Sequence, residues 1–285
     1  NRLFVDYAGK RPVLHDLKTG LEIPIQLFVA VLPASGLVYS EAVESQDLAC
    51  FTSATRGALE YFGGVPRIIV PDNLKAAVSK PDRFDPLINE TYEDFARHYG
   101  CVVMPARVRK PRDKALVEAA VNLVYTRIMA RIRDQRFATL GELNTAIGEY
   151  LDELNDRQMK LFKLSRSQRF ESFEKQCLQP LPASVYELRR FEQPRVQTNY
   201  HVYLRADRHY YSVPYTYARK LVKVAFSRST VEIYHNNLRI AMHRRDLAPG
   251  GYTTTTHHMP SAHRAVVEWT PQRFIRWANK IGPDT

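Results

Sequence analysis

The chain begins with short runs of apolar residues and then changes to helical periodicity. Three runs with β-type composition predict strands at residues 3–7, 25–32 and 37–42. Pro33 to Gly36 has the composition of a turn, so the second and third strands should form a hairpin. From Ser45 the apolar residues follow helical spacing, and Gly63-Gly64 predicts the end of that helix.

The next stretch predicts two more strands and two more helices. In order, we expect a strand at 67–70, a helix at 89–99, a strand at 101–104 and a long helix with Asp113 as its N-cap. The predicted order is therefore β-β-β-α-β-α-β-α. One face of the last helix should pack on a core, because its apolar residues recur at helical spacing: Ala115, Val117, Ala120, Val121, Val124, Ile128 and Ile132.

Residues 137–192 are predicted to form a helical linker region. Thr139 and Glu142 have the spacing of a capping box, and a second helix should run from Ser165 to Phe173. Basic residues recur every three positions: Arg157, Lys160, Lys163, Arg166 and Arg169. This spacing would keep them on one helical face, which either contacts DNA or faces solvent.

From about Gln193 the apolar residues alternate with a period of two, which predicts a small all-β barrel over residues 193–265. Asn236-Asn237 predicts a tight hairpin turn, because Asn tolerates left-handed backbone angles. Residues 266–285 should contain a last helix, with Thr270 as N-cap and Pro271 at its first position. The chain is therefore predicted to have four regions: 1–136, 137–192, 193–265 and 266–285.

Composition limits the class of protein. The chain has 285 residues, and its apolar runs are far shorter than the ~20 residues that a membrane helix needs. No signal peptide is visible, and Cys50, Cys101 and Cys177 lack metal-type spacing. We expect a cytoplasmic protein in a reducing compartment. His257-His258 has no Cys or acid at ligand spacing, so a loop without metal is expected there.

The net charge of +11 is unevenly placed. Residues 1–100 carry 10 Lys and Arg against 13 Asp and Glu, whereas residues 101–285 carry 31 against 17. The second part is therefore expected to meet an anionic partner, for which nucleic acid is the first candidate.

Three acids follow the order of the elements. Asp6 lies in the first strand, Asp72 follows the fourth, and Glu118 lies on the last helix. This arrangement resembles the RNase H-like fold, in which the first and fourth strands are neighbours and the last helix brings a third carboxylate to the same edge. Three such acids suit phosphoryl transfer, because they can hold two divalent ions ~3.5–4 Å apart. Simpler readings remain open: Asp72 as a turn residue, and Glu118 as a solvated acid paired with Lys114.

Four longer segments carry a more specific resemblance: FVDYAGK (4–10), LFVAVLPASGLVYSEA (27–42), ALEYFGGVPRIIVPDNLKAAV (58–78) and KPRDKALVEAAVN (110–122). Together they resemble the DDE transposases of the IstA type, relatives of retroviral integrases and the phage Mu transposase. The resemblance implies an α/β RNase H-like catalytic core with a mixed five-stranded sheet, followed by the helical linker and the barrel. It also implies Asp6, Asp72 and Glu118 as catalytic, metal-binding acids, with two Mg²⁺ or Mn²⁺ ions per active site. The helix-turn-helix region of such transposases is expected upstream of Asn1, which would make this chain a fragment.

The function implied is that of a DNA transposase, which cleaves DNA at transposon ends and transfers the 3′-OH ends into target DNA. The alternatives are a metal-dependent nuclease of the same fold and a catalytically inactive DNA-binding assembly protein. Expected partners are double-stranded DNA, further copies of the chain on paired ends, and an IstB-type AAA+ helper ATPase, with no membrane.

Candidate DNA contacts lie in two groups. Those near the acids are Asn73, Lys75, Arg107, Arg109, Lys110, Arg112 and Lys114; those in the barrel are Arg205, Arg208, Lys220, Lys223, Arg244 and Arg245. They would bind phosphates without reading sequence, and ordinary surface charge is the alternative. Integrase relatives often carry a basic residue two turns after the glutamate. Here that position is Tyr125, so the contact is not transferred to this chain.

Overall fold

The computed structural model describes residues 1–71, 78–80, 87–104, 111–261, 263–264 and 271–281. The side chains of residues 78–80, 87–88, 111–114, 271–274 and 281 are not described. The chain forms two compact units, Asn1–Tyr186 and Glu187–Thr285.

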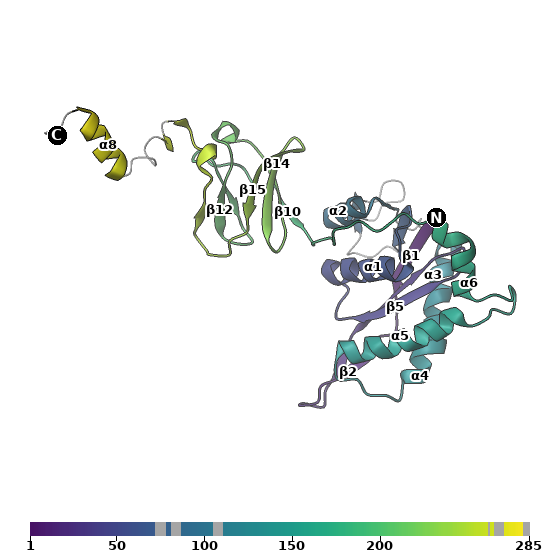
Figure 1. The fold of residues 1–285 in the computed structure, drawn as a ribbon. Coiled ribbons are helices and arrows are strands. Elements are labelled where there is room, and N and C mark those ends of the chain that lie inside the picture. Colours follow the sequence, from purple (N-terminus) through teal and green to yellow (C-terminus); the bar gives the residue numbers. More distant parts are fainter. Residues whose placement is uncertain (72–77, 81–86, 105–110, 262, 265–270, 282–285) are drawn as a thin grey trace. The chain divides into compact units, whose positions relative to one another are not determined.

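The first unit is built on a five-stranded mixed sheet (Figure 1). Its strands are β1 (Arg2–Tyr7), β4 (Gln26–Val31), β5 (Val38–Val43), β6 (Ile68–Pro71) and β9 (Val102–Val103), in the spatial order β5-β4-β1-β6-β9. Strands β5, β4 and β1 are antiparallel neighbours, whereas β6 and β9 run parallel to β1. The first and fourth of these strands therefore lie side by side, and the RNase H-like fold that the sequence predicted is confirmed.

Two helices cover one face of the sheet, α3 (Pro111–Val124) and α5 (Leu140–Asp156). Side chains alternate between the two faces of a strand, so every second residue of β1 and β4 points to these helices. The resulting core includes Phe4, Leu27, Val29, Val124 and Ile147. The apolar helix face predicted for the Glu118 helix is buried here from Val117 to Ile132, although Ala115 is exposed.

The opposite face is covered by α1 (Leu48–Phe62), beside which lies α2 (Glu90–Tyr99). Aromatic rings fill this layer: Tyr7, Phe28, Phe51, Tyr92 and Phe95. Gly63 and Gly100 end the two helices with left-handed φ angles of 67° and 70°, as the sequence predicted.

Two predicted helix starts are wrong. Helix α1 begins at Leu48 rather than Ser45, because Asp47 is the N-cap and its carboxylate accepts the Cys50 N–H at 2.8 Å. Helix α3 begins at Pro111, so Asp113 lies inside the first turn instead of capping it. Proline suits the first helical position, because its fixed φ is already helical and it has no N–H to leave unpaired.

The sequence also missed two short hairpins. Strands β2 (Val13–His15) and β3 (Glu22–Pro24) pair in the segment between the first two predicted strands, and β7 (Val78–Lys80) pairs with β8 (Leu87–Ile88). With two or three residues each, these strands are too short to show a period of two.

Beyond α3 the helix continues as a π-helical turn, η1 (Tyr125–Met129), and a last α-helical piece, α4 (Ala130–Ile132). A π-helical turn adds a residue to the helix and shifts the faces on either side of it. Nothing in the apolar spacing indicated this turn.

The segment predicted as a helical linker packs largely on the first unit. Helix α5 has the predicted capping box at Thr139, and its apolar side packs on strand β5. A second capping box, at Ser165, opens α6 (Arg166–Arg169), which continues through η2 (Phe170–Glu174) and η3 (Lys175–Cys177). The predicted bounds of the four regions remain a prediction.

The predicted stripe of basic residues on one helical face is wrong. Helix α5 ends at Asp156, with Arg157 extended and Lys163 at a φ of 54°. The guanidinium of Arg166 donates to the Leu154 carbonyl, and that of Arg169 to the Ala34 carbonyl. These two cations hold the chain against the core of their unit.

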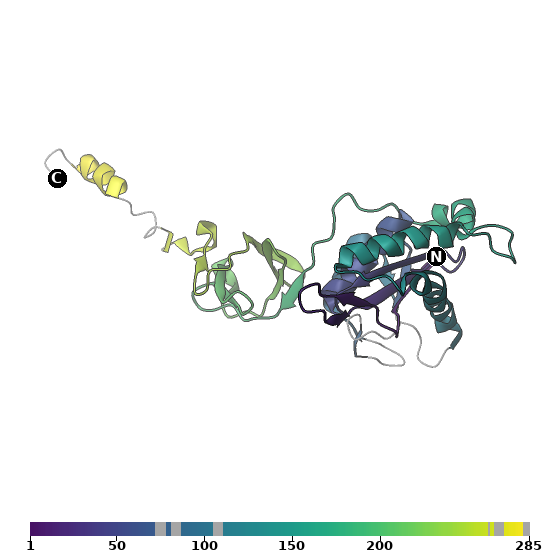
Figure 2. The same ribbon diagram turned by 90° about the horizontal axis from the view of Figure 1, so that it is seen from below.

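The second unit contains two small sheets around one apolar core. Strands β10 (Arg190–Glu192), β13 (Lys223–Phe226), β14 (Thr230–His235) and β15 (Leu238–Arg244) form the first; β11 (His201–Leu204), β12 (His209–Ser212) and β16 (Tyr252–Thr253) form the second. Figure 2 shows these strands arranged around the interior of the unit. The small β domain is thus present, as two separately paired sheets among the described residues rather than one continuous ladder. Asn236 and Asn237 form the predicted hairpin turn, with φ angles of 49° and 64°.

The unit also contains the short helices η4 (Tyr215–Tyr217), between β12 and β13, and η5 (Thr256–His258) and α8 (Pro271–Ile281), which follow the strands. Pro271 occupies the first position of α8 as predicted, while the expected N-cap, Thr270, lies outside the described residues. Within the described ranges, every helix is too short or too polar to cross a bilayer.

Candidate active site

The alternation of strand β1 points Asp6 toward helix α3. Its neighbours at two-residue spacing, Phe4 and Ala8, both belong to the core beneath that helix. Asp6 itself is half-buried at the end of the strand, and its carboxylate accepts the N–H of Tyr7 at 2.8 Å. An acid is thus held at the rim of the core, where it keeps access to solvent.

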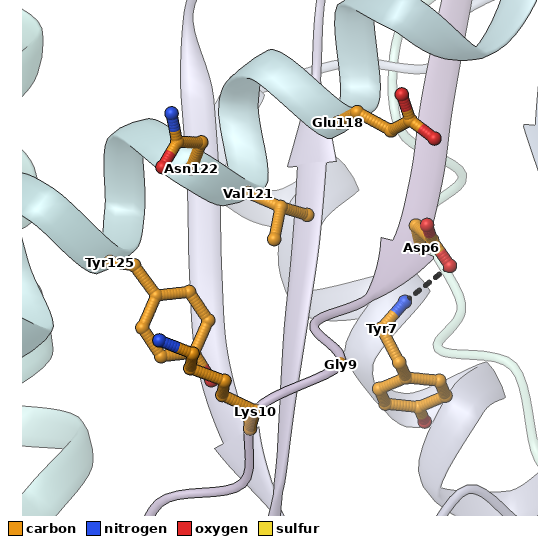
Figure 3. Close-up of a pocket in the computed structure, with 8 residues that line it drawn as sticks. All are labelled: Asp6, Tyr7, Gly9, Lys10, Glu118, Val121, Asn122 and Tyr125. Atoms are coloured by element: carbon orange, nitrogen blue, oxygen red, sulfur yellow. Dashed lines mark hydrogen bonds between the residues drawn. The ribbon is translucent and has the colours of Figure 1, made fainter.

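Helix α3 brings Glu118 to the same place. Val117 and Val121 pack toward the sheet, while Glu118 is exposed at the side of the helix. Figure 3 shows the carboxylates of Glu118 and Asp6 at one pocket, although they come from distant parts of the sequence. Two of the three predicted acids therefore meet.

The pocket has a volume of about 550 Å³. Its lining residues come from the end of β1, the loop after it and one side of the helix: Asp6, Tyr7, Gly9, Lys10, Glu118, Val121, Asn122 and Tyr125 (Figure 3). A cavity of this size, open to solvent and holding acids, an amide and an ammonium group, suits a polar ligand such as a phosphodiester.

Tyr125 joins the helix to the loop that follows Asp6. Its hydroxyl donates a hydrogen bond to the backbone carbonyl of Lys10. Burial raises the pKa of the Tyr125 hydroxyl to about 12, so the group remains a protonated donor at neutral pH. This contact connects the loop after Asp6 to the first residue of the π-helical turn that continues α3.

Sequence reasoning missed Lys10 and Asn122 as site residues and found no role for Tyr125. A helical signal was present, because Asn122 and Tyr125 lie four and seven positions after Glu118 and therefore on nearly the same face. No comparable signal identified Lys10, which reaches the pocket through the path of its loop.

The third predicted acid, Asp72, lies outside the described residues. The same is true of most predicted DNA contacts near the acids: Asn73, Lys75, Arg107, Arg109 and Lys110. Arg112 and Lys114 lie in the first turn of α3, but their side chains are not described, so the alternative pairing of Lys114 with Glu118 stays open. Strand β6 is described as far as Pro71, whose register partner is Val5.

The cations of the second unit differ in their surroundings. Arg205, Arg208 and Arg244 are exposed, as is Lys220, which lies over the Tyr217 ring. Lys223 is half-buried, with its ammonium group 4.6 Å from the centre of the Phe191 ring. These residues remain candidates for contacts with an anion.

Arg245 is engaged within the unit instead. Its guanidinium makes an ion pair with Asp207, whose side chain is fully buried, and also donates to the Ser227 carbonyl. Hydrogen bonding to Asp207 raises the pKa of Arg245. Much of its hydrogen-bonding capacity is therefore already in use.

An RNase H-like sheet with acids on its first strand and last helix is the architecture of polynucleotidyl transferases. A family model described as the C-terminal domain of Mu transposase matches residues 181–255, which include all the described strands of the second unit. Among solved structures, the catalytic core domain of BIV integrase has a TM-score of 0.44 at 15% identity, covering 61% of this chain and 96% of that one.

Several curated relatives match nearly the whole chain. "Putative transposase for insertion sequence IS408" of Burkholderia multivorans is 42% identical over 282 residues, which are 99% of this chain and 54% of that protein. "Putative transposase Rv3428c" of Mycobacterium tuberculosis is 31% identical over 281 residues, 98% of this chain and 67% of that protein. The chain belongs to the family of insertion-sequence transposases, and the predicted resemblance is confirmed. It spans about half the length of the first of these relatives.

Proposed function

We propose that this protein is a DNA transposase, which cleaves DNA at transposon ends and joins the 3′-OH ends to target DNA with divalent metal ions. The observation that carries the proposal is the meeting of Asp6 and Glu118 at one pocket, in a chain of the insertion-sequence transposase family. Both acids lie at the margin of the core, so apolar packing does not account for their positions.

Strand register supports Asp72 as the third acid. Val5 of β1 pairs with Pro71, the last residue of β6. In sequence, Asp6 directly follows Val5 and Asp72 directly follows Pro71. The pairing of β1 with β6 and the sequence that follows this pair support Asp72 as the third acid of the proposed triad.

The donor set fits a hard cation. Carboxylate oxygens, such as those of Asp6 and Glu118, are the ligands that Mg²⁺ and Mn²⁺ prefer. We propose Asp6, Asp72 and Glu118 as the residues that hold two such ions. Bound there, the ions would activate the attacking oxygen and stabilise the leaving one.

The proposed reaction has two steps at phosphorus. A water oxygen attacks the phosphodiester at the transposon end, and the bond to the 3′ oxygen breaks, leaving a free 3′-OH. That hydroxyl oxygen then attacks a target phosphodiester and displaces the 3′ oxygen of the target strand. Each step exchanges one P–O bond for another, so neither a covalent protein intermediate nor an oxidant is required.

Residues around the acids have supporting roles in this proposal. Lys10 presents an ammonium group at the pocket, where it can pair with a phosphate oxygen of the DNA. Tyr125 positions Lys10 through its hydrogen bond to the Lys10 carbonyl. Asn122 can donate its amide N–H groups to a second phosphate oxygen.

DNA binding is assigned mainly to the second unit. Residues 187–285 carry 16 Lys and Arg against 7 Asp and Glu, whereas residues 1–186 carry 25 against 23. Exposed cations such as Arg205, Arg208 and Arg244 would contact phosphates without reading sequence. The same proposal includes assembly of several copies on paired DNA ends and an IstB-type AAA+ ATPase as helper.

The test is strand transfer by the full-length protein on labelled transposon ends with Mg²⁺ or Mn²⁺. Wild type is compared with Asp72→Asn and with Asp134→Asn, an exposed acid outside the pocket, as matched control. Joined products that vanish only in Asp72→Asn support the proposal. Cleavage without joining would indicate a nuclease, and DNA binding without any metal-dependent cleavage would indicate an inactive assembly protein.

A further inference from the structure

Three tyrosines form a row across the outer face of the second unit's three-stranded sheet. Tyr203, Tyr210 and Tyr252 lie on strands β11, β12 and β16, and they are register partners in turn. The ring centroids of Tyr203 and Tyr210 are 4.9 Å apart; those of Tyr210 and Tyr252 are 4.4 Å apart, with planes only 6° from parallel. We name these three residues the tyrosine row.

The tyrosine row plays no part in the apolar core. The adjacent residues on the strands, such as Val202, Leu204 and Tyr211, are fully buried and point inward. Tyr203 and Tyr210 are half-buried, and Tyr252, on the edge strand of the sheet, is 55% exposed. Because exposed aromatic surface is costly to hydrate, a row of three rings on an outer face indicates a binding surface.

Positive charge lies beside the tyrosine row, at the turn that joins β11 to β12. This turn, Arg205 to Arg208, is separated from Tyr203 and Tyr210 by the single pair Leu204–His209. Both arginines are exposed, and among the described residues neither guanidinium makes an ion pair. The carboxylate of Glu192 is engaged at the same turn by the N–H groups of Arg205 and Ala206.

We propose that the tyrosine row binds unpaired bases of a single DNA strand, whose phosphates are held by Arg205 and Arg208. Aromatic rings next to cations suit this ligand, because every unpaired base has a face that can stack and every nucleotide carries a phosphate. A regular duplex would use only the cations, since its bases are already stacked on one another. The inference rests on the proposed function for its biological meaning, because DNA cleavage and joining create strand ends that can fray.

Binding of single strands by the chain tests the proposal. The probe is a fluorescein-labelled oligothymidine of about 15 nucleotides, followed by anisotropy, with a blunt duplex of equal length beside it. Tyr252→Leu removes a ring but keeps an apolar side chain, and Tyr252→Phe keeps the ring. We expect Tyr252→Leu to weaken single-strand binding roughly tenfold while duplex binding changes less than about threefold; Tyr252→Phe should bind as wild type. Equal single-strand affinity in Tyr252→Leu and wild type would overturn the proposal, as would equal losses for both DNA forms.

Photocrosslinking gives a readout that does not depend on a variant's stability. A 5-iodouracil oligonucleotide irradiated with the wild-type chain should crosslink to Tyr252 or Tyr210, as mapped by mass spectrometry. Crosslinks confined to other surfaces, or capture of a second protein copy in their place, would contradict the proposal. Failure of the transposase function is seen separately: binding through the tyrosine row without any joined product would leave this inference standing and remove the proposed function.

Discussion

Asp207 is a fully buried acid whose charge is compensated by one arginine. The guanidinium of Arg245 contacts both oxygens of Asp207, with Nε 2.9 Å from Oδ2 and 3.1 Å from Oδ1. The Asp207 side chain is 0% exposed and that of Arg245 is 18% exposed. A charge at such a position is tolerated only while its partner remains. This pair therefore makes Arg245 primarily a residue of the second unit's interior.

Arg245→Ala is expected to destabilise the second unit by about 3–5 kcal/mol, because it leaves the Asp207 carboxylate buried and unpaired. Arg244→Ala, at the exposed neighbouring position, should change stability by less than about 0.5 kcal/mol. Native-state hydrogen exchange of the β11 to β15 amides measures this unit alone. Similar protection in the two variants would argue against the structural role of the pair.

Histidines that are buried or half-buried form a second polar group in the same unit. His258 contacts the Ser212 hydroxyl at 2.8 Å, and the His243 ring contacts the Ser212 carbonyl at 2.7 Å. Burial lowers the pKa of His258 to about 4, assisted by the nearby His243; burial also lowers the pKa of His243 and of His201. These rings are therefore neutral in the folded protein at neutral pH.

The lowered pKa values of these histidines determine how the stability of the second unit depends on pH. A histidine whose pKa is lower folded than unfolded adds stability above its unfolded value of 6.5, and this stability is lost as pH falls from there toward about 4. We expect the second unit to lose on the order of 1 kcal/mol between about pH 7.5 and pH 5, after allowance for the partial exposure of His258. The urea concentration at half-unfolding of the second unit (residues 187–285), monitored by pulse proteolysis at both pH values, measures this loss of stability. His258→Gln should flatten the slope, whereas the exposed His257→Gln should not; a stability independent of pH would be inconsistent with buried neutral rings.

At the scale of elements, helix α5 covers the open edge of the sheet. Strand β5 is the last strand on its side, so it offers unpaired backbone groups. The Asn155 side chain accepts the Val38 N–H at 3.2 Å and donates to the Val38 carbonyl at 2.8 Å. Asn144 makes the same pair of bonds to Ala42, at 2.7 and 3.0 Å. Two amide side chains, three helical turns apart, thus take the place of a neighbouring strand.

Asn155→Leu should lower the stability of the first unit by about 2–3 kcal/mol, because the buried N–H and carbonyl of Val38 lose their partners. Glu149→Ala, exposed on the same helix, serves as the control and should be close to neutral. Urea unfolding with hydrogen exchange at β5 compares the two. If Asn155→Leu is as stable as Glu149→Ala, the proposed capping of the edge strand is wrong.

These elements show which features a sequence can predict. The strands of the main sheet, helices α1, α2, α3 and α5 and the Asn236-Asn237 turn were predictable, because apolar periodicity and turn residues report local structure. The positions of Asp6 and Glu118 at one pocket followed from the predicted fold. The roles of Asn144 and Asn155 were not predicted, because their partners are backbone groups of a distant strand. Every residue has such groups, so the sequence does not indicate which of them will bind a side chain.

The contact between Tyr125 and Lys10 was not predicted for the same reason, and the stripe of basic residues after α5 was predicted wrongly. In both cases the structure depends on contacts between distant parts of the chain. A hydroxyl that bonds a backbone carbonyl can belong to almost any surface tyrosine. Regular spacing of cations suggested a helical face from Arg157 to Arg169, but α5 ends before it because Arg157 is extended. Tertiary contacts decided these positions, and local propensity did not.

At the scale of the whole molecule, chemistry and charge are divided between the two units. The first unit has nearly balanced charge and holds the candidate acids; the second carries a clear excess of cations and the tyrosine row. Under the proposed function, the first unit performs phosphoryl transfer while the second holds DNA by its backbone and by unpaired bases. Substitutions in the tyrosine row should therefore affect DNA binding, whereas substitutions of the acids should affect the reaction with binding retained.

The most direct test of the central claim is a double-variant comparison of strand-transfer rates at saturating divalent metal. The proteins are wild type, Asp6→Asn, Glu118→Gln and the combination, each first shown to bind DNA as wild type does. If the two carboxylates serve one metal centre, each single change should lower the rate at least about 10³-fold, and the combination should cost little more. Single variants within about tenfold of the wild-type rate would contradict the assignment of this pocket as the active site.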